Sequence, residues 1–167
     1  GYPVSAMLTA EMFIRDILLA RQKLPLPDGF EVNSTLAKTV PSNMGVEEFV
    51  RVSVGNVQGK IVAAPLGRGA GLISSLTKAQ GIIRIEPASS GLSAGSTVPV
   101  SMIRQLQPKN TILAVGSHDL SLELLGVFLR RKMDRAWLSC AHVGSMGGIM
   151  AIRNNEAHIT GIHLLDE

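Results

Sequence analysis

Residues 111–119 read TILAVGSHD, and residues 136–148 read AWLSCAHVGSMGG. Each stretch begins with an apolar run typical of a buried strand, breaks at glycine and serine, and continues into a helical pattern. The two helical patterns run to about Lys132 and from about Met146 to Asn155, and a third strand-like run covers Ala157 to Leu165. The order β-α-β-α-β predicts a parallel wound segment.

Both breaks place a serine, Ser117 or Ser145, at or near the start of a predicted helix. The first N–H groups of a helix have no partner inside it, and the helix dipole is positive there, so such a turn can hold an anion. Parallel strands bring their carboxyl ends together. We therefore expect Ser117, His118 and Ser145 to form an oxyanion site. The alternative is that both serines are plain helix caps.

Other chemistries fit these residues less well. Ser117, His118 and Asp119 are consecutive, so they cannot form a hydrolase relay among themselves. Cys140 is the only cysteine, which excludes an intrachain disulfide and a cysteine-based zinc site. His158 and His163 are five apart on the predicted strand and would face opposite sides. We expect hydrogen-bonded histidines and no metal ligands.

Upstream of residue 111 the pattern changes twice. Ser5 to Ala20 carries apolar residues at helical spacing, and residues 23–29 contain two prolines and a glycine. From Glu31 to Ile103, short runs of period two alternate with glycine and proline turns, which indicates a small antiparallel barrel or sandwich. Pro99 should lie at an edge or bulge of it.

The expected fold class is therefore a multi-part α+β chain: one helix, a small antiparallel β barrel or sandwich, and a β-α-β-α-β parallel wound segment. The expected divisions are residues 1–30, the end of a preceding domain with a helix over 5–20; residues 31–104, a β domain; residues 105–110, a linker; and residues 111–167, a partial α/β domain.

The amino-acid composition argues against several classes of function. The 167 residues are 46% hydrophobic and 17% charged, which is typical of a globular chain. The 16 basic residues are scattered and only 4% of the chain is aromatic, so no single-strand nucleic-acid surface is indicated. No apolar run reaches the roughly 18 residues of a membrane helix. One cysteine fits a cytoplasmic protein. Because the chain opens with Gly1-Tyr2-Pro3, we expect a piece of a longer protein.

The barrel segment resembles a known family. The resemblance is carried by the motifs over residues 48–52 (EFVRV), 69–76 (GAGLISSL), 79–83 (AQGII) and 92–100 (LSAGSTVPV). These resemble the C-terminal β domain of the molybdopterin molybdotransferases, the MoeA and gephyrin E-domain family, and residues 1–6 resemble the turn and helix that close the catalytic domain. Residues 111–167 resemble a periplasmic-binding-protein-like domain fused to some prokaryotic members.

This resemblance implies molybdenum cofactor biosynthesis, by transfer of molybdate to adenylylated molybdopterin with release of AMP and with Mg²⁺ as the cofactor. It implies a homodimer whose site lies between the catalytic domain of one subunit and the β domain of the other. Cofactor-binding roles would fall to Arg51, Gly69 and Ser74, and the catalytic residues to a domain that this chain lacks. A loop serine of the family is Ala70 here, which supplies no hydroxyl.

Arg51 keeps two interpretations. Its fork of donors suits the cofactor phosphate, and the alternative is a solvated strand arginine. Two other functions also stay open: a non-catalytic module that binds or senses an oxyanion such as molybdate, and a dimerisation scaffold in which the edge of the incomplete α/β sheet pairs with a second copy.

Overall fold

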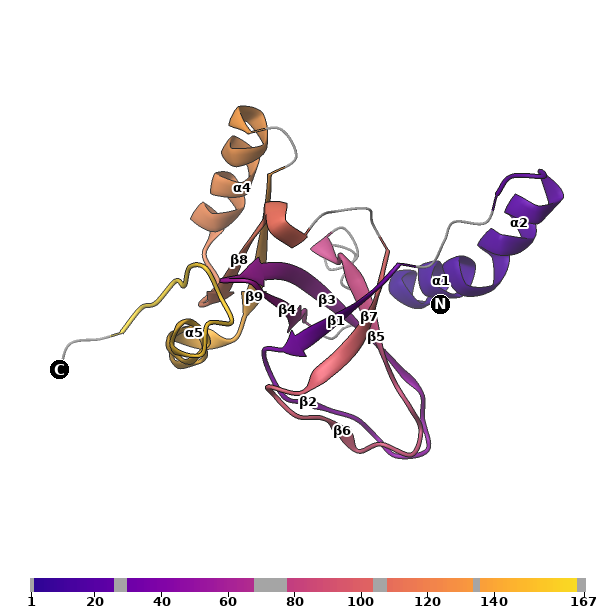
Figure 1. Ribbon diagram of the computed structural model, residues 1–167, viewed down its shortest axis with the longest axis horizontal. Coiled ribbons are helices and arrows are strands. Elements are labelled where there is room, and N and C mark those ends of the chain that lie inside the picture. Colours follow the sequence, from indigo (N-terminus) through magenta and orange to yellow (C-terminus); the bar gives the residue numbers. More distant parts are fainter. Residues whose placement is uncertain (1, 26–29, 68–77, 104–107, 134–135, 165–167) are drawn as a thin grey trace.

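The computed structural model describes residues 2–25, 30–67, 78–103, 108–133 and 136–164 (Figure 1). A closed five-stranded barrel stands at its centre. An N-terminal helix extends from one side of the barrel, and a small α/β segment lies on the other side.

The N-terminal helix runs without a break through α1 (Pro3–Thr9), a π-helical turn η1 (Ala10–Ile14) and α2 (Arg15–Arg21). It begins at Pro3, two residues before the expected start at Ser5, because the fixed φ of proline suits the first helical turn. Ser5 therefore lies inside the helix, and Tyr2 precedes its first residue. The apolar side chains of Phe13, Ile17 and Leu18 are at least half exposed, at 63%, 67% and 50%.

The barrel strands follow the order β1-β4-β3-β5-β7. Their bounds are β1 (Glu31–Leu36), β3 (Glu48–Val57), β4 (Lys60–Pro65), β5 (Gly81–Ile85) and β7 (Thr97–Met102). Two short strands, β2 (Val40–Pro41) and β6 (Gly91–Leu92), pair with each other beside the barrel. The expected small barrel is thus present, with a mixed α+β chain around it.

One pair in this barrel departs from the expected antiparallel pattern: β1 and β4 are parallel, with Thr35 opposite Val62. A ring with an odd number of strands cannot alternate direction all the way round, so five strands require one parallel pair. Pro99 lies where expected, at an unpaired position on one side. β5 pairs with β7 only at Ser101 and Met102, beyond Pro99.

Strand β3 is the longest and is buried on both faces, which organises the rest of the chain. Its inward residues, Val50, Val52 and Val54, join the barrel core. Its outward residues meet other segments. The Ser139 hydroxyl donates to that of Ser53, and a Cβ at Gly55 would lie 3.2 Å from Cβ of Leu113.

The α/β segment begins with the 3₁₀ turn η2 (Pro108–Asn110) and continues through β8 (Thr111–Gly116), α4 (Leu120–Lys132), β9 (Trp137–His142) and α5 (Gly144–Arg153). Strands β8 and β9 are parallel, with Ala114 opposite Cys140. The expected third strand over residues 157–165 is not formed as a strand. Its described part has one parallel bridge, between Ile159 and Ala114, and backbone bonds from Val115 and Ser117 to Ile159 and Gly161.

A second hydrophobic core joins the α/β segment to the barrel. It contains Val57, Val62 and Ala64 from the barrel and Leu113, Val115, Ala141, Ala151 and Ala157 from the α/β segment. Polar contacts reinforce it. Gln80, fully buried, accepts from the Val54 N–H at 2.6 Å and donates to the Thr111 hydroxyl at 3.0 Å. Among the described residues, no helix is long and apolar enough to span a membrane.

Candidate functional site

The two serines singled out in the sequence meet in space. The hydroxyl oxygens of Ser117 and Ser145 are 2.9 Å apart. The Ser145 hydroxyl also accepts the N–H of His163 at 3.1 Å and lies 3.0 Å from the carbonyl oxygen of His163. The strand ends therefore converge as expected, but the chain around Gly161 and His163 already occupies several of their hydrogen bonds.

The two turns differ at their helix starts. The N-cap of α4 is Asp119, whose carboxylate accepts from the Ser121 N–H at 2.7 Å. Hydrogen bonding to the Ser121 side chain, and then to its backbone N–H, holds the pKa of Asp119 below its usual range, so a negative charge already occupies that helix start. The start of α5 has no side-chain cap. An incoming anion is thus favoured at α5 alone, and Ser117 caps neither helix.

His118 does not join the serine pair. Its ring lies against that of His142, with ring centroids 4.4 Å apart. Partial burial, followed by the charges of His118 and Lys78, lowers the pKa of His142. His158, by contrast, binds the barrel: Nδ1 accepts the Leu113 N–H at 2.9 Å and Nε2 lies 2.9 Å from the carbonyl oxygen of Asn56. These contacts make His158 a structural residue.

Arg51 is not a solvated strand arginine, because only 8% of it is exposed. It projects from the outer face of β3, its Nη2 donates to the carbonyl oxygen of Gly67 at 3.2 Å, and desolvation lowers its pKa. It also lines a small cavity with Met7 and Glu11 of the N-terminal helix. The other two expected cofactor-binding residues, Gly69 and Ser74, lie outside the described residues.

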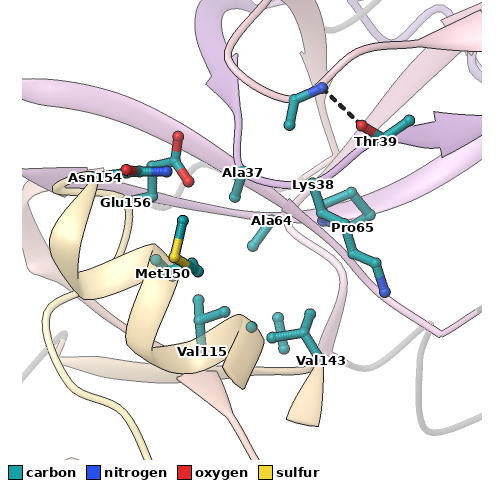
Figure 2. A pocket seen from close by; sticks show the side chains of 14 residues that line it. Ala37, Lys38, Thr39, Ala64, Pro65, Val115, Val143, Met150, Asn154 and Glu156 are labelled. Carbon is teal, nitrogen blue, oxygen red and sulfur yellow. Dashed lines mark hydrogen bonds between the residues drawn. The ribbon is translucent and has the colours of Figure 1, made fainter. Parts of the chain in front are cut away.

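A larger cavity, not foreseen from the sequence, lies between the barrel and α5 (Figure 2). Its volume is about 340 Å³. The barrel contributes Ala37 and Ala64 to its wall, and the α/β segment contributes Val143, Met150 and Ala151. The wall is made mostly of small apolar side chains that do not fill the space between the two parts.

One acidic side chain, Glu156, reaches this cavity. Only 6% of Glu156 is exposed, and burial raises the pKa of its carboxyl, while Lys60 and the Asn154 side chain oppose the rise. The sequence gave no direct signal for this. Glu156 follows two asparagines and reads as a solvated turn, and only the path of the chain after α5 buries it.

The described residues contain no clustered set of metal-ligating side chains. No group of three or more histidine, cysteine, aspartate or glutamate side chains lies close enough there to hold a metal ion. Cys140 is buried beside Leu138 on β9, and burial raises the pKa of its thiol. A protonated thiol is a poor metal ligand.

Two family models match this chain. Residues 33–103 match the MoeA C-terminal region (domain IV), and residues 127–167 match the PBP superfamily domain. These matches fall in the β-domain segment and in the later part of the α/β segment, and they confirm the resemblance there; residues 1–6 and 111–126 lie outside both.

Curated relatives match a similar part. A protein of Methanocaldococcus jannaschii, named as a molybdopterin biosynthesis protein, is 33% identical over 105 residues, which is 62% of this chain and 23% of that protein. The molybdopterin molybdenumtransferase of Bacillus subtilis is 27% identical over 106 residues, 63% of this chain and 25% of that protein. The chain thus spans about a quarter of the length of these relatives.

Solved structures agree on the fold. The molybdopterin biosynthesis moeA protein of Pyrococcus horikoshii superimposes with a TM-score of 0.50 at 25% identity, over 61% of this chain and 26% of that one. A molybdenum cofactor biosynthesis protein of Pyrococcus furiosus gives a TM-score of 0.50 at 31% identity, over 61% and 36%.

Proposed function

We propose that this chain is the C-terminal part of a cytoplasmic molybdopterin molybdotransferase, which inserts molybdate into adenylylated molybdopterin and releases AMP. The observation that carries the proposal is the closed barrel, whose residues 33–103 match the MoeA C-terminal region. Because the matched residues make up only 23% and 25% of the two curated relatives, the activity belongs to a longer protein in this proposal.

Arg51 is the residue of this chain that we place at the substrate. Its guanidinium is held on the outer face of the barrel, near the N-terminal helix, by burial and by the Gly67 carbonyl. A planar fork of donors suits a phosphate group. In the proposed homodimer, this side chain would face the catalytic domain of the second subunit and bind the phosphate of adenylylated molybdopterin.

The N-terminal helix supports the same arrangement. Its exposed apolar side chains, among them Phe13 and Ile17, are of the kind that another part of a protein covers. We propose that the rest of the catalytic domain covers them.

The test is AMP release from adenylylated molybdopterin and molybdate by the 167-residue chain, alone and mixed with a separately produced catalytic half. We expect release only from the mixture. Arg51→Gln should lower kcat/KM by about tenfold or more, as expected for a lost charged hydrogen bond. Arg84→Gln is the matched control on β5, since Arg84 is exposed and pairs with Glu47. Release by the chain alone, or none from the mixture, would contradict the proposal.

A second candidate function rests on the 2.9 Å contact between Ser117 and Ser145: oxyanion binding at the uncapped start of α5. Calorimetric titration with molybdate, tungstate, sulfate and phosphate tests it. Saturable binding that Ser145→Ala removes, and that Ser121→Ala keeps, would support an oxyanion module. With no heat from any of the four and no AMP release from the mixture, the dimerisation scaffold remains.

A further inference from the structure

We propose that the cavity between the barrel and α5 binds a small molecule with an ammonium group and a short apolar body, and that the carboxylate of Glu156 holds the ammonium (Figure 2). This site is separate from Arg51 and from the two serines, and it does not depend on the molybdenum chemistry proposed above.

The cavity is built into the structure by residues with fixed positions. Ala64, Ala141 and Ala151 are each less than 5% exposed and belong to the core that joins the two parts. Because their side chains are single methyl groups, the facing surfaces leave a space of about 340 Å³. That volume is at the lower end of the range for small-molecule sites, which are mostly apolar with a few polar groups.

Glu156 is held at the cavity by the end of α5. Asn155 takes a left-handed backbone with φ of 55°, and the N–H groups of Asn155 and Glu156 donate to the carbonyl oxygens of Ile152 and Ala151. This is a Schellman motif, which reverses the chain at a helix end. The reversal lays residues 157–161 along β8 and turns the Glu156 side chain into the junction.

A buried carboxylate needs a partner. Ionised groups are costly to bury unless they are paired. The charge of Lys60 and a hydrogen bond from the Asn154 side chain favour the ionised form, but burial outweighs both, and among the described residues Glu156 forms no ion pair. An ammonium supplies the missing charge, and an apolar body suits the wall of Ala37, Ala64 and Met150. An anionic ligand would be repelled at this position.

Lys38 distinguishes two kinds of ligand that carry an ammonium group, apolar amino acids and simple alkyl amines. It lines the cavity on the side away from Glu156 and is itself exposed (Figure 2). An apolar amino acid could place its ammonium at Glu156 and its carboxylate toward Lys38, whereas a simple alkyl amine would use Glu156 alone. Both share the ammonium and the apolar body.

The experiment is calorimetric titration of the 167-residue chain with isoamylamine and L-leucine. Isoamyl alcohol, without charge, and isovalerate, with the opposite charge, are the ligand controls. We expect saturable binding of at least one ammonium ligand. Glu156→Gln, which keeps the shape and removes the charge, should weaken it by about tenfold or more. Glu86→Gln, at an exposed carboxylate, should leave it unchanged.

A second variant tests the location independently of charge. Ala94 lines the cavity from an exposed turn, so Ala94→Phe should close the entrance without disturbing the core and should abolish binding. Tighter binding of leucine, lost in Lys38→Gln, would identify amino acids as the source; equal binding would identify simple amines. The proposal is overturned if neither amine binds, if isoamyl alcohol binds as well as isoamylamine, or if Glu156→Gln and Ala94→Phe bind like the wild type.

Discussion

Burial of the Glu156 carboxylate costs stability when the carboxyl is ionised. Burial raises its pKa from the ordinary value of 4.5, so the folded state holds a proton that the unfolded state has already lost over the pH range between the two pKa values. The corresponding stabilisation is present below about pH 4.5 and is lost as the pH rises through the folded pKa. Above the folded pKa the ionised carboxylate lies in a largely apolar cavity, where the charge of Lys60 and the Asn154 side chain offset part of the cost of burial.

Glu156→Gln should therefore stabilise the chain at pH 7, and the gain should shrink towards zero as the pH falls to about 4.5. Urea unfolding at a series of pH values measures this difference. Glu86→Gln is the control, since Glu86 is exposed and should give a difference near zero throughout. A loss of stability in Glu156→Gln at pH 7 would show that the carboxylate is stabilised by its surroundings, contrary to this prediction.

His142 acts on the same measurement with the opposite sign. Its pKa is lowered from 6.5, first by desolvation and then by His118, so its contribution to stability is present above pH 6.5 and is lost as the pH falls through the folded pKa. The wild type and Glu156→Gln both contain His142, so its pH dependence is the same in the two. The difference between wild type and Glu156→Gln therefore isolates the carboxyl.

For single residues, the sequence was informative where a side chain lies in a strand-to-helix turn. Ser117 and Ser145 could be predicted to meet because parallel strands end at one edge, and their hydroxyls lie 2.9 Å apart. The cap of α4 was missed, because Asp119 and Ser117 are both good caps and only the backbone geometry decides between them. Glu156 was missed because its burial depends on the turn of the chain at the end of α5, which lays it against a cavity that it shares with residues distant in sequence such as Ala64.

Two helical glycines show how differently the same residue type is used by neighbouring elements. A Cβ on Gly148 of α5 would lie 2.8 Å from the carbonyl oxygen of Val115 and 2.9 Å from Cα of Gly116, both backbone atoms of β8. A Cβ on Gly126 of α4 would lie 3.5 Å from Cβ of Leu138, an ordinary contact. Glycine thus sets the close approach of α5 to β8, while α4 would accept a methyl group.

We predict opposite effects of alanine at these two positions. Gly148→Ala should destabilise the chain by about 2 kcal/mol, because backbone must move to admit the methyl group. Gly126→Ala should stabilise it by about 0.5–1 kcal/mol, through the better helix propensity of alanine. Urea unfolding of both variants checks this, and each serves as the control for the other. Equal effects would show that α5 adjusts more freely than its contacts indicate.

Elements with a clear period were the predictable ones. The apolar runs predicted β8 and β9 with bounds within about one residue of those observed, whereas the alternation over residues 49–54 predicted β3 but stopped three residues short of its end at Val57. Strand β1 was missed because Glu31–Leu36 contains asparagine, serine and threonine, which give no clear apolar pattern. Its pairing with β7 and β4 makes it a strand of the barrel. The run over 157–165 looks like a strand in sequence, yet its described part bonds to β8 at few positions.

On the scale of the whole molecule, the barrel and the α/β segment share a hydrophobic core, although the sequence predicts them as separate domains. Strand β3 uses one face for the barrel core and the other for the second core, so its residues stabilise both parts. Gln80 spans the same junction by bonding Val54 in the barrel and Thr111 in β8. These contacts join residues far apart in sequence, which local periodicity does not reveal.

The shared core predicts a single cooperative unfolding transition. Trp137, the only tryptophan, lies on β9 and reports on the α/β segment by fluorescence, whereas far-ultraviolet circular dichroism reports on the chain as a whole. We expect the two probes to give the same urea midpoint. Val62→Ala, a change on a barrel strand at a fully buried side chain, should lower the stability seen by both probes by about 2 kcal/mol.

Val46→Ala is the control, because Val46 is 55% exposed and its loss should change stability by less than about 0.5 kcal/mol. If the fluorescence of Trp137 changed at a lower urea concentration than the circular dichroism, the α/β segment would be unfolding on an intact barrel. Insensitivity of the tryptophan signal to Val62→Ala would lead to the same conclusion, and the second core would then be too weak to couple a ligand at α5 to the barrel. Coincident midpoints that shift together would mean that a ligand bound in the cavity between the two parts stabilises the barrel as much as the segment beside it.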